Sequence, residues 1–100
     1  MTKPYYAVIF TSKRTSGDHG YAAMAHKMED LARQQPGFLG FESARDEIGI
    51  SVSYWESLQD IAHWKSNTDH LIAQEKGRTD WYAWYKVRIC LVEREYGIDQ

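Results

Sequence analysis

The chain has 100 residues, of which 43% are hydrophobic and 14% are aromatic, and its formal net charge is -2. This length suits a single domain with a buried core, spanning residues 1–100, and is too short for two. A slightly acidic chain lacks the clustered Lys and Arg that phosphate contacts require, so we expect no nucleic-acid partner.

The first predicted element is a strand over residues 5–14, because this segment is rich in aromatic and β-branched residues. Both of its faces are apolar: one carries Tyr6, Val8 and Phe10, and the other carries Tyr5, Ala7 and Ile9. The segment TSGDHG that follows consists of turn residues, with Ser16 and Asp18 as candidate helix caps.

A helix is predicted over residues 20–35. Its apolar residues recur at steps of three and four and form one stripe, made of Tyr21, Met24, Met28 and Leu31. Pro36 disfavours helical geometry at the residue before it, and Gly37 permits a turn, so we expect the helix to end there.

Two strands are predicted next, one from Phe38 to about Arg45 and one within the segment ISVSYWE, residues 50–56. The connection RDEIG is short, which predicts an antiparallel hairpin. Ser57 is a candidate cap for a second helix, predicted over residues 57–77, and the segment KSNTD at residues 65–69 is a candidate interruption of it.

The last predicted element is a long strand. Successive residues alternate between its two sides: one side carries Val87, Ile89 and Leu91, and the other carries Arg88, Cys90 and Val92. Residues 79–85 fit either the end of the second helix or the start of this strand, and the pattern does not decide between them.

The order of elements, β-α-β-β-α-β, predicts an α+β ferredoxin-like subunit. Its four strands would form one antiparallel sheet with both helices on one face. The first and last strands are apolar on both faces, yet two helices cover only one. An uncovered face with several aromatic residues would be a large adhesive patch on a monomer, so we expect a homodimer that packs sheet against sheet.

Several further classes are disfavoured. No apolar run approaches the ~18 residues of a membrane span, and MTKPYYAVIF resembles no signal peptide, so we expect no membrane partner and a cytoplasmic location. Cys90 is the single cysteine, which leaves no disulfide framework within one chain. No dinucleotide, Walker, HExxH or G-x-S-x-G motif occurs, so we expect no cofactor and no metal.

The segments PGFLGFES, SVSYWES and HWKSNTDH, with the terminal YKVRICLVEREYG, resemble the antibiotic biosynthesis monooxygenase family of dimeric α/β barrels. The resemblance covers residues 5–97 and implies the ferredoxin-like subunit and the barrel dimer. The family includes cofactor-independent monooxygenases that act on polycyclic phenols, quinol oxygenases, haem-degrading enzymes and members without a known activity. It therefore suggests oxygen chemistry on an aromatic small-molecule ligand.

Three residues are candidates for the site. Trp64 matches the helix tryptophan that lines the pocket in several relatives, although an aromatic at helical spacing also fits a packed core. His70 would be the general base that accepts a phenol proton, or else a surface histidine beside Asp69. Asn67 would hydrogen-bond an oxygenated intermediate together with Trp64, or else act with Thr68 as a cap of a resumed helix.

Haem degradation is disfavoured within this resemblance. The haem-degrading members carry an asparagine on the first strand and a histidine about ten residues after the helix tryptophan. Here the first strand has no asparagine, and Gln74 stands ten residues after Trp64. The interpretation is thus a cofactor-independent monooxygenase for a phenolic or quinol-like molecule, with a non-catalytic small-molecule-binding dimer as the alternative.

Overall fold

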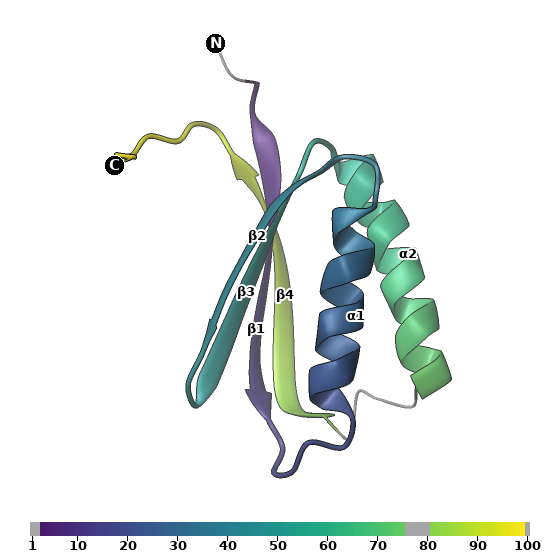
Figure 1. Cartoon of the computed structure of the whole chain (residues 1–100). Coiled ribbons are helices and arrows are strands. Elements are labelled where there is room, and N and C mark those ends of the chain that lie inside the picture. Colours follow the sequence, from purple (N-terminus) through teal and green to yellow (C-terminus); the bar gives the residue numbers. More distant parts are fainter. Residues whose placement is uncertain (1–2, 76–80, 100) are drawn as a thin grey trace.

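The computed structural model describes residues 3–75 and 81–99, and over residues 70–75 it describes the backbone. Six elements follow one another along the chain (Figure 1). They are β1 (Tyr5–Arg14), α1 (Tyr21–Arg33), β2 (Phe38–Arg45), β3 (Ile48–Trp55), α2 (Leu58–Glu75) and β4 (Tyr82–Val92). The ambiguous stretch before the last strand is therefore part of β4 from Tyr82 onward.

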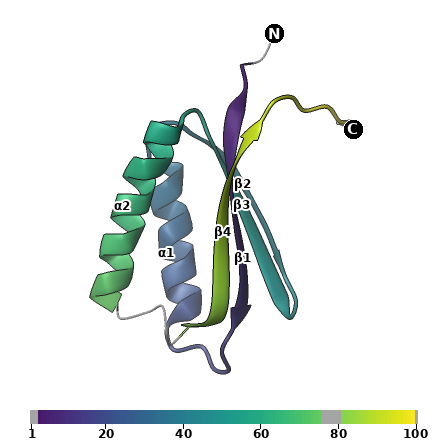
Figure 2. The same cartoon turned by 180° about the vertical axis from the view of Figure 1, so that it is seen from behind.

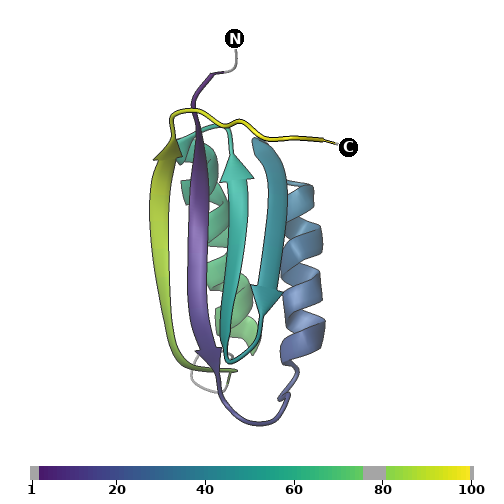
Figure 3. The ribbon, with the colours of Figure 1, turned by 90° about the vertical axis from the view of Figure 1, so that its left-hand side faces the viewer.

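The four strands form one sheet in the order β2-β3-β1-β4, and all three neighbouring pairs are antiparallel. Both helices lie on the same face of this sheet, as the two opposite views show (Figures 1 and 2). The predicted ferredoxin-like α+β fold is confirmed. The other face, seen in Figure 3, carries no helix, and we call it the open face.

The turn into α1 is capped by Asp18, as expected. Its carboxylate accepts hydrogen bonds from the backbone N–H groups of Gly20 and Ala22, at 3.0 and 3.2 Å. Gly20 has a φ of 82°, which a residue without a Cβ adopts at little cost. Ser16 is the other candidate cap. Its backbone carbonyl contacts the His19 ring nitrogen, at a distance of 3.1 Å.

Ser57 caps the start of α2. The Ser57 hydroxyl accepts a hydrogen bond from the Asp60 N–H at 3.0 Å and donates one to the Asp60 carboxylate at 2.8 Å. The Asp60 carboxylate also lies against Gly37, whose φ is 80° and where a Cβ would overlap it. A glycine after Pro36 therefore serves both the turn out of α1 and the cap of α2.

The predicted interruption of α2 at residues 65–69 is wrong. The helix runs continuously through this segment, where Lys65 and Asp69 form an i,i+4 ion pair at 2.7 Å. The Thr68 hydroxyl donates to the Lys65 carbonyl at 2.9 Å within the helix, so Thr68 caps no resumed helix. Within this segment Lys65, Ser66 and Asn67 are exposed and Thr68 and Asp69 are half-buried, all in one continuous helix. The predicted end of the helix at Gly77 lies outside the described residues.

The core lies between the helices and the centre of the sheet. Its buried members are Ala32 of α1, Trp55 of β3 and Ile61 of α2, and the partly buried side chains packed on them are Tyr6, Val8, Phe38 and Trp64. α1 packs chiefly on β2 and α2 chiefly on β3. Edge strand β4 is therefore the part of the sheet that the helices cover least, as Figure 3 shows. No helix among the described residues is long and apolar enough to cross a membrane.

Candidate functional site

Trp64 lies on the second turn of α2 and faces the sheet. Its indole stacks on that of Trp55, with ring centroids 6.0 Å apart and ring planes 25° apart. Trp55 is fully buried, and its indole N–H donates to the Ser53 hydroxyl at 2.8 Å. Trp64 is partly exposed, and its N–H donates to no partner within the described part of the chain. Of the two tryptophans, Trp64 is thus the one with a donor to offer a ligand.

An apolar strip on β4 lies on the same side of the sheet. The register pairs Leu91 with Tyr6, Ile89 with Val8 and Val87 with Phe10, so these three β4 residues face the helices' side. They are nevertheless 52%, 50% and 46% exposed, because neither helix reaches far enough to cover β4. With Tyr85, which stacks on Phe10, they form what we call the β4 strip.

The β4 strip begins in the same row of the sheet as Trp55, with Tyr6 of β1 between them. One row of side chains crosses all four strands at that end of the sheet, and it consists of Phe38, Trp55, Tyr6 and Leu91. Trp64 stacks on the Trp55 member of this row from the helix side. The result is an aromatic wall next to exposed apolar surface, which is the kind of lining that small aromatic ligands use.

Asn67, the second predicted site residue, has a partner on another element. Its side-chain amide donates to the Gln35 side-chain oxygen at 3.2 Å, just beyond the C-terminus of α1. Gln35 in turn donates to the Leu31 carbonyl at 3.1 Å. The structure therefore directs the Asn67 amide toward the end of α1, whereas the Trp64 indole packs on β3.

His70, the predicted general base, belongs to α2, and its side chain lies outside the described residues. Its role remains a prediction. His63, one residue before Trp64, is exposed.

A second aromatic cluster, at the opposite end of the sheet, was not anticipated from the sequence. Tyr82 packs edge-on against Tyr21 of α1 and against Phe10. Burial and a hydrogen bond with Tyr21 raise the pKa of Tyr82 above its ordinary value. The Arg14 guanidinium lies 3.6 Å above the Tyr21 ring, and its Nε donates to the Trp81 carbonyl at 2.8 Å.

Arg45 reaches this cluster across the sheet. Its guanidinium lies over Gly49, where a Cβ would overlap it, and donates to the Ser12 hydroxyl at 2.5 Å. Gly49 is an isolated glycine inside a strand, a pattern that indicates close approach of another group. That signal was available in the sequence, although it does not say which side chain approaches.

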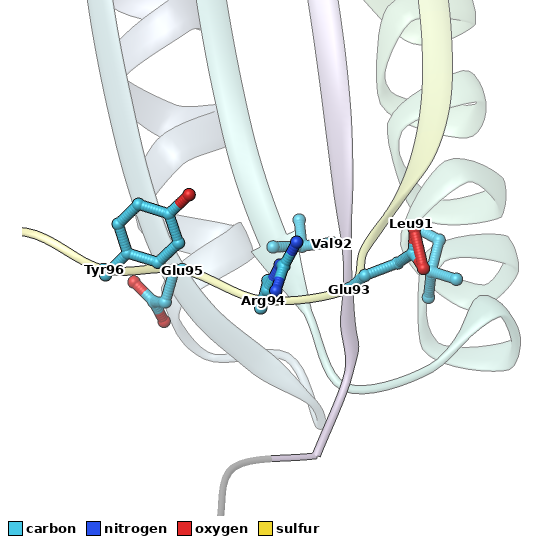
Figure 4. Close-up of a pocket in the computed structure, with 6 residues that line it drawn as sticks. All are labelled: Leu91, Val92, Glu93, Arg94, Glu95 and Tyr96. Carbon is cyan, nitrogen blue, oxygen red and sulfur yellow. The ribbon is translucent and has the colours of Figure 1, made fainter.

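A shallow, open hollow lies along the C-terminal segment (Figure 4). It has a volume of about 560 Å³ and is lined by Leu91, Val92, Glu93, Arg94, Glu95 and Tyr96. Leu91 is the one residue that it shares with the β4 strip. Neither Trp64 nor Asn67 is among the residues that line this hollow. Among the described residues, no group of three or more His, Cys, Asp or Glu side chains is placed to hold a metal ion.

The strand order and the one-sided helices define a ferredoxin-like subunit, and its sequence identifies the family. The chain belongs to the antibiotic biosynthesis monooxygenase family, whose model matches residues 10–76. It is 52% identical over 94 residues to "Uncharacterized protein YqjZ" of Bacillus subtilis (strain 168). The aligned region covers 92% of this chain and 82% of that protein.

Solved structures show the same fold at low sequence identity. SnoaB, a cofactor-independent oxygenase from Streptomyces nogalater, has a TM-score of 0.65 at 10% identity, over 99% of this chain and 100% of that one. A protein of unknown function from Nitrosomonas europaea has a TM-score of 0.71 at 8% identity, over 97% of both chains.

Proposed function

We propose that this protein is a cofactor-independent monooxygenase that acts on a phenolic or quinol-like aromatic small molecule. The observation that carries the proposal is the stack of Trp64 on Trp55 beside the exposed β4 strip, in a chain of this family. The aromatic wall would hold the rings of the substrate, and the Trp64 N–H would donate to an oxygen atom on it.

In this chemistry the substrate supplies the electrons. A base removes the phenolic proton, and the electron-rich anion reacts with O2. One oxygen atom ends in a carbonyl group of the quinone product and the other leaves as water. The protein contributes an apolar environment and a few hydrogen bonds. His70 is the proposed proton acceptor, and Trp64 and Asn67 are the proposed donors to the oxygenated intermediate.

Asn67 already donates one hydrogen bond to Gln35, so the proposed role would use the second N–H of its amide. This contact favours a second candidate function, a non-catalytic dimer that binds an aromatic small molecule on the same wall. In that case Asn67 would stay with Gln35 as a link between the helices, and Trp64 alone would contact the ligand.

We propose that the protein works as a homodimer through its open face. This face carries exposed apolar side chains, including Ile48 and Ile50 on β3 and Trp84 on β4. An obligate interface of this kind buries roughly 2,000 Å² or more in total. Light scattering at micromolar concentration should report twice the 11.7 kDa mass of the chain.

The experiment that separates the two functions is a screen of phenols and hydroquinones with the purified, metal-free protein. Oxygen consumption and ligand-induced quenching of tryptophan fluorescence are measured on the same samples. Catalysis predicts compounds that both bind and consume oxygen. Quenching without oxygen uptake over the whole panel would instead support the binding module.

A further inference from the structure

Two arginine side chains lie at the end of the sheet where β1 ends and α1 begins (Figure 1). The guanidinium carbon of Arg14 is 3.6 Å from the centre of the Tyr21 ring, and that of Arg45 is 5.9 Å from the same centre. Both groups are on the helices' side of the sheet, because Tyr21 belongs to α1. A second copy of the chain on the open face would therefore leave them accessible.

A β-bulge brings Tyr82 to the same place. The register between β1 and β4 shifts between Lys13 and Arg14, which leaves Ala83 as an extra residue on β4. Strict alternation would put Tyr82 on the open side, whereas the bulge turns its ring edge-on to Tyr21. Burial and a hydrogen bond with Tyr21 raise the pKa of Tyr82, and the charges of the two arginines oppose that rise. Both charges therefore act on the Tyr82 hydroxyl.

Neither guanidinium is neutralised by a carboxylate within the described part of the chain. The ion pairs found there lie on the helices, and they are His26–Asp30, Arg33–Glu29 and Lys65–Asp69. Arg14 donates to three backbone carbonyls, and Arg45 donates to the Ser12 hydroxyl. The Asp18 carboxylate, close to Arg14 in the chain, is used as the cap of α1. A guanidinium has five N–H groups, so each arginine keeps donors for a ligand.

Both groups are held in position by the protein itself. The Arg45 guanidinium lies over Gly49 and donates to Ser12, which is fully buried. Arg14 is fixed by its three carbonyl acceptors and by the ring of Tyr21 against which it lies. Donors that are already positioned lose little side-chain entropy when a ligand binds, so the arrangement favours binding.

Aromatic rings adjoin the two arginines. Tyr82 packs on Phe10 and on Tyr85, with ring centroids 5.3 and 5.8 Å apart, and Phe10 stacks on Tyr85 at 5.3 Å. Tyr85 is 37% exposed and is the member of the β4 strip at this end of the sheet. A ligand with an anionic group at the arginines would therefore find a surface on which to place a ring.

We infer that this end of the sheet binds the oxyanion of a small aromatic ligand, a carboxylate or a phosphate, with Arg14 and Arg45 as the charged donors. Planar guanidinium groups suit both kinds of oxyanion. Tyr21 and Tyr82 share one hydrogen bond, which leaves one phenol O–H as a further donor. The inference goes beyond the proposed function, because it uses none of the residues proposed for catalysis.

Nuclear magnetic resonance of the isotope-labelled full chain tests the site. The probes are benzoate and phenyl phosphate, and benzyl alcohol is the neutral control. An anion should shift the amide signal of Gly49, which lies beneath Arg45, and the Nε–H signals of the two arginines. The indole N–H signal of Trp64, at the opposite end of the sheet, reports separately on the aromatic wall. The anion that binds more tightly identifies the carboxylate or the phosphate as the preferred group.

Substitutions test the donors with the tighter of the two probes. Arg45→Gln should raise its dissociation constant about 10-fold or more, as the loss of a charge-assisted hydrogen bond does. Gly49→Ala keeps the charge but displaces the guanidinium, so it should also weaken binding. Arg33→Gln removes a positive charge that Glu29 already pairs on α1, and as the matched control it should leave the dissociation constant unchanged.

Circular dichroism checks the fold of each variant. Folded Arg45→Gln and Gly49→Ala chains that bind the probe as tightly as the unchanged chain would overturn the inference. So would a Gly49 signal that neither anion shifts, or one that benzyl alcohol shifts as far as the anions do. A shift at the Trp64 indole alone would overturn the anion site and leave the proposed function standing.

Discussion

Trp64 of α2 stacks on Trp55 of β3 with ring centroids 6.0 Å apart. The two residues mark the ends of the segment in which the chain passes from the sheet to the helical layer. Trp55 is fully buried with its N–H bound to Ser53, whereas Trp64 is partly exposed. The stack therefore joins a core residue to a surface residue that can contact a ligand.

Replacing Trp64 by Phe should keep most of the stacking but remove the N–H donor. A hydrogen bond worth about 0.5–1.5 kcal/mol predicts a fall in turnover of about 2- to 10-fold with little change in stability. Trp64→Ala should also destabilise the fold, by less than the about 3–5 kcal/mol of a fully buried aromatic. Oxygen uptake and urea unfolding measure the two effects. Unchanged turnover in Trp64→Phe would argue against a donor role.

Replacing His70 by Ala should leave the fold intact and lower turnover about 10²-fold, as the loss of a general base does. Turnover of the unchanged chain should rise with pH through the ordinary histidine pKa of about 6.5, and His70→Ala should lack this rise. His63→Ala, on the same helix, is the control and should keep both the rate and the profile. The same pH profile in His70→Ala would show that another group accepts the proton.

Replacing Gly37 by Ala should destabilise the protein more than replacing Gly20 by Ala. Both glycines have positive φ, 80° and 82°, so both substitutions carry a backbone cost of about 1–2 kcal/mol. A Cβ at Gly20 meets no other atom within 4 Å, whereas one at Gly37 displaces the Asp60 carboxylate, which accepts a hydrogen bond from the Ser57 cap of α2. Thermal unfolding measures the difference. The Asp60→Ala background, which removes the overlap, should bring the two costs closer together.

Tyr54 should contribute stability that is lost in strongly alkaline solution. Hydrogen bonding to Glu42 raises its pKa from 10.0 to about 12 in the folded protein. The protonated phenol is thus favoured on folding, so the contribution is complete below pH 10 and is lost as the pH rises through about 12. Unfolding free energies of the unchanged chain and Tyr54→Phe should converge over this window. In Glu42→Gln, absorbance titration should show one tyrosine ionising at a lower pH than in the unchanged chain. An unaltered titration would show that Glu42 is not the cause of the raised Tyr54 pKa.

Hydrophobic periodicity was sufficient to predict the order of the elements and most of their bounds. The aromatic and β-branched run over residues 5–14 and the three-and-four spacing from Tyr21 to Leu31 each match one observed element. These patterns are local, because a strand or helix next to a core must repeat its apolar residues with its own period. Residues 65–69 misled the prediction because polar residues that resemble a cap also suit the exposed side of a helix.

Which residues meet in space was decided by the tertiary structure. The sequence places Trp64, Asn67 and His70 on one helix, but the position of α1 determines that Asn67 contacts Gln35. The same holds for Arg45, which reaches Ser12 over Gly49 because β2, β3 and β1 are adjacent in the sheet. Contacts between residues about 30 positions apart depend on strand order and helix placement, which no local period encodes.

The sequence by itself determined that β1 and β4 are apolar on both faces, and from this that one face of the sheet needs a partner. The tertiary structure decided that β4 is an edge strand and that the helices leave its strip exposed. It also decided that Glu42 and Arg88 stand at opposite edges of one row, although 46 positions separate them in the chain. Alternation within a strand depends on the chirality and pleat of the backbone alone. The row that contains Glu42 and Arg88 depends instead on the register between strands, and this register is set when the whole sheet packs against its helices.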